Sequence, residues 1–242
     1  MRIIRDLSLQ SSTMRRQNYM HRFPRRLVLA AALATGSLLA RAQQTPTPIQ
    51  VLDATGLHPP AGASVAIVEF DDLECPACAA ANPTLKAAAD HYKIPWVRHD
   101  FLIPYHNWSR AAAINARWFD QKSKSLGDEY RNQVFANQAN IYNPDVLAQF
   151  TLKFAQSHGL ALPFALDPQG KLAADVNADV ALGTRTGIKS TPTIFIVTAG
   201  GKGPAFTQVM NPAVQLFTDI DQAIANTPPA PKPAGVKKVH GE

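Results

Sequence analysis

The stretch that decides the fold is FDDLECPAC, residues 70–78, because it holds the only two cysteines of the 242-residue chain, separated by two residues. Before it, residues 65–70 form an apolar, β-branched run that predicts a buried strand. After it, residues 78–92 are rich in alanine and predict a helix. The cysteine pair therefore lies where a strand passes into a helix.

This position favours a reactive thiolate, because the first N–H groups of a helix lack intrahelical partners and the helix dipole places partial positive charge there. With Cys75 at the cap and Pro76 in the first turn, we expect Cys75 to have a lowered pKa and to face solvent. Cys78 lies one turn deeper and should be shielded. Such a pair suits thiol–disulfide exchange, in which the outer sulfur attacks and the inner sulfur resolves the mixed disulfide.

Two other interpretations of the cysteine pair are weighed beside this one. A structural zinc site usually needs four ligands, but the chain has no third cysteine and none of its seven histidines stands in an H-x(3–5)-H arrangement. We therefore expect neither a metal nor another cofactor. A purely structural disulfide is the alternative interpretation, although so short a loop constrains the unfolded chain less than a long one.

The positive charge of the chain is concentrated at its beginning. Residues 1–42 hold eight of the 24 Lys and Arg residues and one of the 18 Asp and Glu residues. The remaining 200 residues carry 16 basic and 17 acidic side chains, a net charge of −1, whereas the whole chain has +6. Composition therefore gives no basis for a nucleic-acid partner of the remaining chain.

The same leader has the pattern of a secretory signal peptide. Arg25 and Arg26 precede the apolar run 27–40, and Ala40 and Ala42 fit the A-x-A cleavage pattern. We predict export to the periplasm or another extracytoplasmic space, by either the general or the twin-arginine route; an uncleaved anchor is the alternative, although 14 apolar residues are few for a membrane span. Oxidising conditions there favour an oxidant or a disulfide shuffler.

The rest of the chain predicts a mixed α/β domain with a helical insertion. Residues 43–60 are expected to be a flexible lead-in with one short edge strand, and residues 94–103 a second core strand, parallel to the first and reached by a crossover helix. Residues 104–187 then turn helical, with start signals at Asn143-Pro144 and Asp167-Pro168. Four apolar faces support these helices: Ala111, Ile114 and Trp118; Tyr130, Val134 and Phe135; Leu147, Phe150 and Phe154; and Leu172, Val176 and Val180.

The β pattern returns near the end of the chain. Residues 193–197 and 206–209 flank a glycine-rich turn and predict a β-hairpin. A last helix over residues 212–225 presents an apolar face made of Val214, Phe217, Ile220 and Ile224. Residues 227–242 are rich in proline and lysine and are expected to be disordered.

This order of elements resembles the thioredoxin fold with a helical insertion, and the chain resembles exported DsbA-like and BdbD-like thiol–disulfide oxidoreductases. Four segments carry the resemblance, which spans roughly residues 61–226: VEF at 68–70, CPAC at 75–78, PYHNWSRAA at 104–112 and GIKSTPTIF at 187–195. It implies a thioredoxin-like domain over residues 61–103 and 188–226 and an inserted helical subdomain over residues 104–187.

The resemblance also implies roles for individual residues. Cys75 would be the nucleophile and Cys78 the resolving thiol. Pro192 matches the family's cis-proline, which faces the disulfide and leaves the preceding backbone free to pair with an extended substrate, so that Thr191, Pro192, Pro76 and Ala77 would contact substrate. Glu69 stands where the family carries a buried acid, whose raised pKa suits it to take the proton of Cys78. A surface position for Glu69 is the alternative.

Other polar residues near the motif receive simpler interpretations. Asp71, Asp72 and Glu74 are expected to be solvated loop charges that oppose thiolate formation. His106 is taken as a structural or capping residue, and His99 as part of a strand.

One residue departs from the family pattern. The strongest oxidants of the family carry histidine at the position of Ala77, and that histidine stabilises the thiolate of the reduced form. Alanine offers neither charge nor hydrogen bond, which predicts a less oxidising disulfide.

Three function classes follow. The first is an oxidoreductase acting on cysteine thiols of exported polypeptides, monomeric and, if an oxidase, recharged by a quinone-linked membrane partner. The second is a non-catalytic binding protein or chaperone with a structural disulfide. The third is a reductase or isomerase with a dedicated client.

Overall fold

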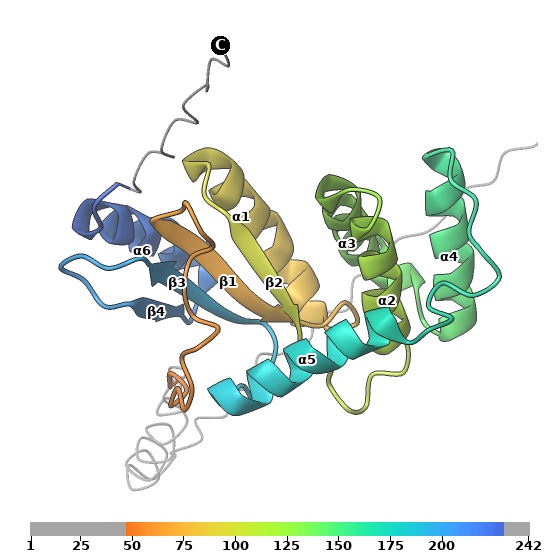
Figure 1. Cartoon of the computed structure of the whole chain (residues 1–242), viewed down its shortest axis with the longest axis horizontal. Helices are drawn as coiled ribbons and strands as arrows, with labels where there is room; N and C mark the ends of the chain where they lie inside the picture. Colours follow the sequence, from red (N-terminus) through yellow and green to blue (C-terminus); the bar gives the residue numbers. More distant parts are fainter. Residues whose placement is uncertain (1–46, 230–242) are drawn as a thin grey trace, which may run out of the picture. The chain divides into compact units, whose positions relative to one another are not determined.

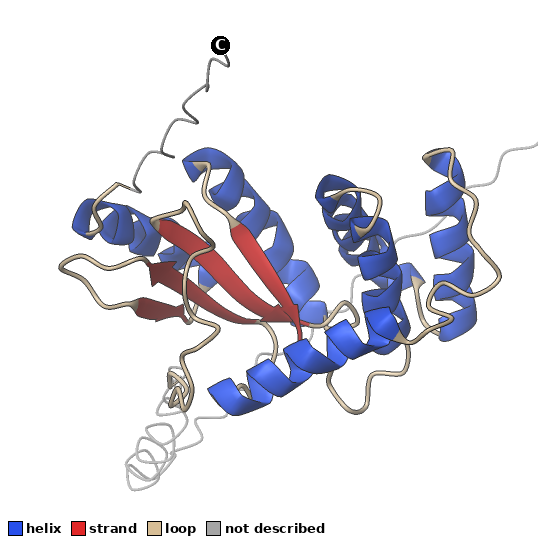
Figure 2. Ribbon diagram, viewed as in Figure 1, coloured by secondary structure: helices blue, strands red, loops and turns tan. Residues whose placement is uncertain are grey.

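A four-stranded mixed sheet organises the computed structural model, which describes residues 47–229 (Figures 1 and 2). The strands have the order β2-β1-β3-β4, with β1 parallel to β2 and antiparallel to β3, and β3 antiparallel to β4. Their bounds are β1 Val65–Asp71, β2 Trp96–Asp100, β3 Thr193–Thr198 and β4 Phe206–Val209. The parallel β1–β2 pair joined by a crossover helix, and the C-terminal hairpin, are confirmed.

Side-chain alternation along β1 builds two cores, one on each face of the sheet. Val65 and Ile67 face the layer formed by α1 (Pro76–Tyr92) and α6 (Pro212–Asn226). Ala66, Val68 and Phe70 face the other side, where Leu182 of α5 (Lys171–Thr186) packs together with Ile49 and Val51 of the lead-in. β1 is buried along its whole length, which explains its near-continuous apolar sequence.

The segment between β2 and β3 is a helical insertion. It contains α2 (Ser109–Asp120), α3 (Lys124–Asn137), the 3₁₀ turn η1 (Gln138–Asn140), α4 (Pro144–Ser157) and α5. Phe119, Tyr130 and Phe154 meet in its core with ring centroids 4.7–5.2 Å apart. The Tyr130 hydroxyl is 2.7 Å from Oγ1 of Thr151, so this buried polar group has a partner. The predicted α/β fold with a helical insertion is confirmed.

Three local predictions are wrong in whole or in part. Residues 47–60 form no strand. The helix expected to begin after Asp167 begins at Lys171 instead, and the Asp167 carboxylate still accepts hydrogen bonds from the first-turn amides of Leu172 and Ala173. The predicted face of α6 is only partly right: Ile220 is buried as expected, but Leu216 is buried with it, whereas Val214 is 72% exposed. Leu216 and Ile220 also have a helical i, i+4 spacing.

Some expectations fall on residues that the structure does not describe. The predicted signal peptide, residues 1–42, lies outside the described part, as do residues 230–242 of the predicted tail. Among residues 47–229, no helix combines the length and the apolar character that a membrane crossing requires.

Gly183 offers a test of how closely α5 packs on the sheet. A Cβ at this position would lie 2.5 Å from Cδ2 of Phe101 and 3.2 Å from Cδ1 of Phe70. We expect Gly183→Ala to lower the free energy of unfolding by about 1–3 kcal/mol, because overpacking outweighs the gain of about 1 kcal/mol in helix propensity. Denaturant unfolding measures the change. Ala181→Gly, at an exposed position of α5, is the control for propensity alone, and stabilisation by Gly183→Ala would contradict the packing described.

Candidate active site

Cys75 caps the N-terminus of α1, directly after the sheet. Its backbone is extended, with φ −80° and ψ 119°, and Pro76 occupies the first turn, where no N–H is needed. The Cys75 carbonyl accepts the amide of Ala79 at 3.1 Å and thereby begins the helix. No side chain caps this end of α1, so the free first-turn amides point toward the Cys75 sulfur.

The two free thiols have very different environments. Desolvation, together with the hydrogen bond that Cys78 donates, raises the pKa of Cys78 far above its ordinary value. That hydrogen bond is also the largest cause that lowers the pKa of Cys75 to about 5; the Thr191 side chain and the amides of Cys78 and Ala77 lower the pKa further, against an opposing desolvation. The pair is thus a low-pKa thiolate beside a protonated thiol.

The expectation that Cys75 faces solvent is wrong in degree. The residue is only 8% exposed, whereas Cys78 is completely buried. Pro76 and Ala77, the residues between them, are exposed. The ordering of the two sulfurs is therefore as expected, but only a small part of Cys75 is exposed.

A cis-proline faces the thiolate. The Thr191–Pro192 peptide bond is cis, and the Sγ of Cys75 lies 3.4 Å from the Thr191 carbonyl oxygen. Both residues are half-buried at the start of β3. The structure thus brings Thr191 and Pro192 to the sulfur although they lie more than 110 positions further along the chain.

Glu69 is buried in β1, as expected from its apolar neighbours, with 1% of its surface exposed. Desolvation raises its pKa to about 7, while the charge of Arg98 and a 3.0 Å hydrogen bond from the Trp96 indole oppose the shift. The family resemblance indicated this acid. Trp96 and Arg98 were not predicted as site residues, although a charged residue within an apolar strand could have drawn attention to Arg98.

The acidic residues before Cys75 are not solvated loop charges. Asp71 and Asp72 are 2% and 1% exposed. Asp72 accepts hydrogen bonds from the amides of Glu74 and Ile103, at 2.8 Å each, and contacts Nδ1 of His106, also at 2.8 Å. Asp72 can be buried because backbone amides satisfy its charge, whereas Asp71 ends β1 and its Oδ2 has no hydrogen-bond partner among the described residues. A sequence pattern reveals neither environment.

Glu74 and Gln138 fix the loop from the side of the insertion. Glu74 caps α2 by accepting hydrogen bonds from the amides of Trp108 and Ser109 at 2.6 and 2.8 Å. The Gln138 amide donates to the carbonyls of Leu73 and Cys75 at 2.9 and 3.1 Å. The segment that carries the nucleophile is therefore held by the helical subdomain, a role that sequence reasoning missed for both residues.

Comparison with known proteins agrees with this architecture. The sequence profile of the family described as thioredoxin matches residues 60–200. The chain belongs to the thioredoxin family. No curated protein matches its sequence significantly.

Solved structures of DsbA-like proteins share the fold of this thioredoxin-family chain. The thiol-disulfide exchange protein alpha-DsbA2 from Wolbachia pipientis is 19% identical with a TM-score of 0.54, over 68% of this chain and 84% of that one. BdbD from Bacillus subtilis, in its oxidised form, is 19% identical with a TM-score of 0.53, over 73% and 95%. Wolbachia pipientis alpha-DsbA1 is 17% identical with a TM-score of 0.52, over 75% and 96%.

A pocket adjoins the cysteine motif of this thioredoxin-family protein. Its volume is about 340 Å³, and Ala77 of the motif, cis-Pro192, Val209 and Met210 all line it. Most of the lining is apolar. The cysteine motif therefore borders a surface that suits apolar groups.

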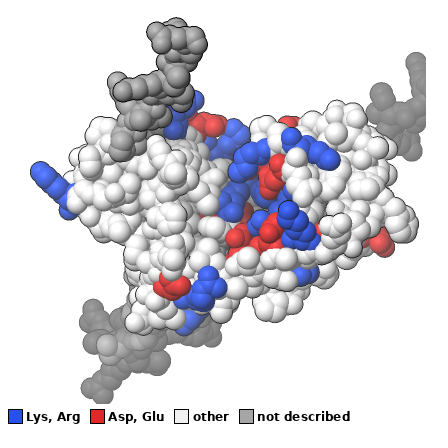
Figure 3. All heavy atoms as spheres, in the orientation of Figure 1, with Lys and Arg blue, Asp and Glu red and all other residues white. Residues whose placement is uncertain are grey.

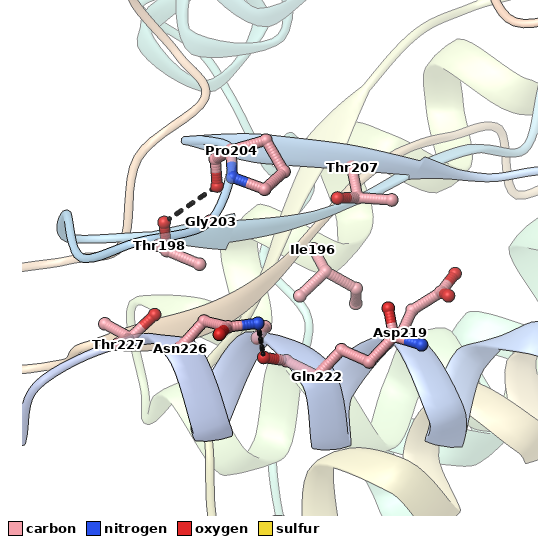
Figure 4. A pocket seen from close by; sticks show the side chains of 10 residues that line it. Ile196, Thr198, Gly203, Pro204, Thr207, Asp219, Gln222, Asn226 and Thr227 are labelled. Atoms are coloured by element: carbon pink, nitrogen blue, oxygen red, sulfur yellow. Dashed lines mark hydrogen bonds between the residues drawn. The ribbon is translucent and has the colours of Figure 1, made fainter.

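A second, smaller pocket lies away from this chemistry. Its volume is about 90 Å³, and it lies between β3, the β3–β4 turn and α6 (Figure 4). It borders Thr198, at the opposite end of β3 from Pro192, and Asp219 is its one acidic lining residue. Neither cysteine lines it, so we do not assign the reaction to this pocket.

The reactivity of Cys75 should follow its lowered pKa. We expect its rate of alkylation by iodoacetamide in the reduced protein to rise to half of its maximum at a pH of about 5 and to be flat above neutral pH. Cys78→Ala removes the largest stabilising hydrogen bond and should move that midpoint to higher pH. Rates measured as a function of pH test both statements, with Cys75→Ala as the control that no other group is alkylated. A midpoint near the ordinary value of 9.0 would contradict the geometry.

Proposed function

We propose that this chain is an exported thiol–disulfide oxidoreductase that exchanges a Cys75–Cys78 disulfide with the thiols of substrate proteins. The single observation that carries the proposal is the low-pKa thiolate of Cys75, which lies beside the buried thiol of Cys78 and 3.4 Å from the carbonyl before a cis-proline. A structural disulfide needs neither the lowered pKa nor the facing proline. The binding-protein alternative is therefore not favoured.

The exchange would proceed through a mixed disulfide on Cys75. In the oxidising direction, a substrate thiolate attacks Sγ of Cys75, the Cys75–Cys78 bond breaks, and Cys78 leaves with the electron pair and takes up a proton. A second substrate thiolate then attacks the substrate sulfur of the mixed disulfide and releases Cys75 as a thiolate. Two electrons pass from substrate to protein, and the low pKa of Cys75 favours its departure.

Substrate would bind across Pro76, Ala77, Thr191 and Pro192. Pro76 and Ala77 are exposed, and Ala77 and Pro192 line the apolar pocket of about 340 Å³. An extended polypeptide lying along the backbone before Pro192 would place a cysteine against the exposed part of Cys75 and a neighbouring apolar side chain in the pocket. Exposed substrate segments that have not yet folded meet both requirements.

Location and partners follow from the leader and from the chemistry. The signal-peptide pattern of residues 1–42 supports a periplasmic or other extracytoplasmic site of action on exported polypeptides. For an oxidase, a quinone-linked membrane protein would restore the disulfide. We propose a monomer, and the absence of a histidine at Ala77 keeps the reductase or isomerase direction open.

The exchange reaction can be tested with purified protein lacking residues 1–42, the form that the proposed cleavage would produce. We expect it to accelerate reduction of insulin by dithiothreitol, Cys75→Ala to abolish this activity, and Cys78→Ala to accumulate mixed disulfides with added cysteine-containing proteins, because the resolving thiol is missing. Non-reducing electrophoresis and mass spectrometry detect those adducts. No acceleration by the wild-type chain, together with no adducts on Cys78→Ala, would overturn the proposed function.

The residue at position 77 should tune the reduction potential. Ala77→His adds a charged or hydrogen-bonding group beside the Cys75 thiolate, so the pKa of Cys75 should fall and the disulfide should become more oxidising, by about 30 mV for each unit of pKa. Equilibration with glutathione buffers measures the potential. Ala77→Gln, similar in size but uncharged, is the control, and an unchanged potential in Ala77→His would refute the role given to this position.

A further inference from the structure

Two carboxylates are buried side by side beneath the cysteine motif. Glu69 and Asp71 are two residues apart on β1, so both point toward the face of the sheet that α1 covers. Cys78 is on the buried face of α1. The exposed fractions of Glu69 and Asp71 are 1% and 2%, which places two acids in the layer where the resolving thiol is buried.

Arg98 of β2 is the positive charge shared by these two acids. Its Nε lies 3.9 Å from both Oε2 of Glu69 and Oδ2 of Asp71, within ion-pair range but beyond hydrogen-bond distance. Arg98 is held in place by Asn82 of α1 and by the Trp96 ring, whose centroid is 3.6 Å from its Cζ. Its guanidinium therefore cannot move toward one acid without losing these contacts.

The other charges around the pair already have partners. Arg131 of α3 forms two hydrogen bonds with Asp120, and Asp100 of β2 binds Arg117 at 2.6–2.7 Å. The charged and titratable groups that face Glu69 and Asp71 from the elements packed around them are Cys75, Cys78, Arg98, Asp100 and Arg131. On the surface seen in Figure 3, exposed charged side chains gather mainly across the middle of the view.

One guanidinium neutralises one carboxylate, and a second buried carboxylate beside it is unfavourable unless it holds a proton. The atoms are consistent with this condition. Among the described residues, Oε1 of Glu69 and Oδ2 of Asp71 have no hydrogen-bond partner. Desolvation raises the pKa of Asp71 well above its ordinary value, and the charge of Glu69 raises it further.

We propose that Glu69 and Asp71 hold one proton between them at neutral pH, and that this proton passes to Cys78 when its disulfide opens and returns when the disulfide closes. The inference deepens the proposed function and rests on it. Asp71 is its new component, because the family resemblance assigns a role to Glu69 alone.

The proton transfer balances the exchange reaction. When a substrate thiolate attacks Cys75, the S–S bond breaks and Cys78 leaves as a thiolate; the carboxyl pair then gives up its proton, and Cys78 becomes a thiol. When Cys78 later attacks a mixed disulfide, it returns that proton to the pair, and the substrate leaves as a thiolate. Of the two acids, the charge of Asp71 raises the pKa of Cys78 more than that of Glu69 does, so Asp71 is well placed for the exchange.

The pH dependence of disulfide opening distinguishes a proton shared by two carboxyl groups from a proton held by Glu69 alone. Glu69 has a pKa of about 7, so above that pH a lone Glu69 has no proton to give, whereas the pair still holds one on Asp71. We expect the oxidised wild-type protein to react with dithiothreitol thiolate at a nearly constant rate through mildly alkaline pH. Asp71→Asn should slow this step about 100-fold there and much less below pH 7, because general acid catalysis typically contributes at least that factor.

Two further variants complete the experiment. In Glu69→Gln the charge that holds the proton on Asp71 is gone, so the alkaline rate should also fall, and in the double variant the rate should be low at every pH. Asp179→Asn is the matched control, because it removes a partly buried, Arg117-bound carboxylate elsewhere and should leave the profile unchanged. Circular dichroism confirms that each variant folds.

An infrared measurement needs no variant. At mildly alkaline pH the oxidised wild-type protein should show the C=O stretch of a protonated carboxylic acid, which should weaken when the disulfide opens, and carboxyl-¹³C labelling of aspartate should shift that band. An absent or unshifted band, or an Asp71→Asn rate profile equal to that of wild type or of Asp179→Asn, would overturn the shared proton while leaving the exchange reaction intact. Failure of the wild-type protein to react with dithiothreitol at all would instead contradict the proposed function.

Discussion

The hydrogen bond from Cys78 to the sulfur of Cys75, at the N-terminus of α1, is the interaction on which the site depends. It is the largest cause of the low pKa of Cys75 and also keeps the inner thiol protonated. The first-turn amides and the Thr191 side chain also lower the pKa of this sulfur. Because burial opposes the thiolate, these contacts must outweigh desolvation, and they do so only while β1, α1 and the start of β3 keep their places.

The surroundings of the motif serve that requirement. The carboxylates of Asp72 and Glu74 accept hydrogen bonds from backbone amides. Such a bond to a charged group contributes about 1.5–3 kcal/mol to stability, and together these bonds hold the loop in one conformation. Deeper in the sheet the conditions are the reverse. Arg98 lies 3.9 Å from two carboxylates and forms a hydrogen bond with neither. The negative charge of the two acids beneath Cys78 is therefore only partly neutralised.

Much of the fold could be predicted from sequence because it rests on periodicity and on local end signals. The β1 run, the alanine-rich helix after CPAC and the hairpin around the glycine turn are of this kind. Contacts between distant segments could not be predicted in the same way. The burial of Asp71 and Asp72, the position of Arg98 between β1 and α1, and the limited exposure of Cys75 depend on which amides and guanidinium groups the tertiary fold brings near. In α6 the burial of Ile220 was predicted and that of Leu216 was missed, because two overlapping sets of apolar residues fit the helical spacing.

Gln138 gives the inserted helices a direct mechanical connection to the nucleophile. Gln138 lies in the short 3₁₀ turn that follows α3, and its side-chain amide donates hydrogen bonds to the carbonyls of Leu73 and Cys75. Any displacement of that turn must either break both hydrogen bonds or drag the cysteine loop with it. The position of the reactive sulfur therefore depends in part on a segment that is inserted into the thioredoxin topology.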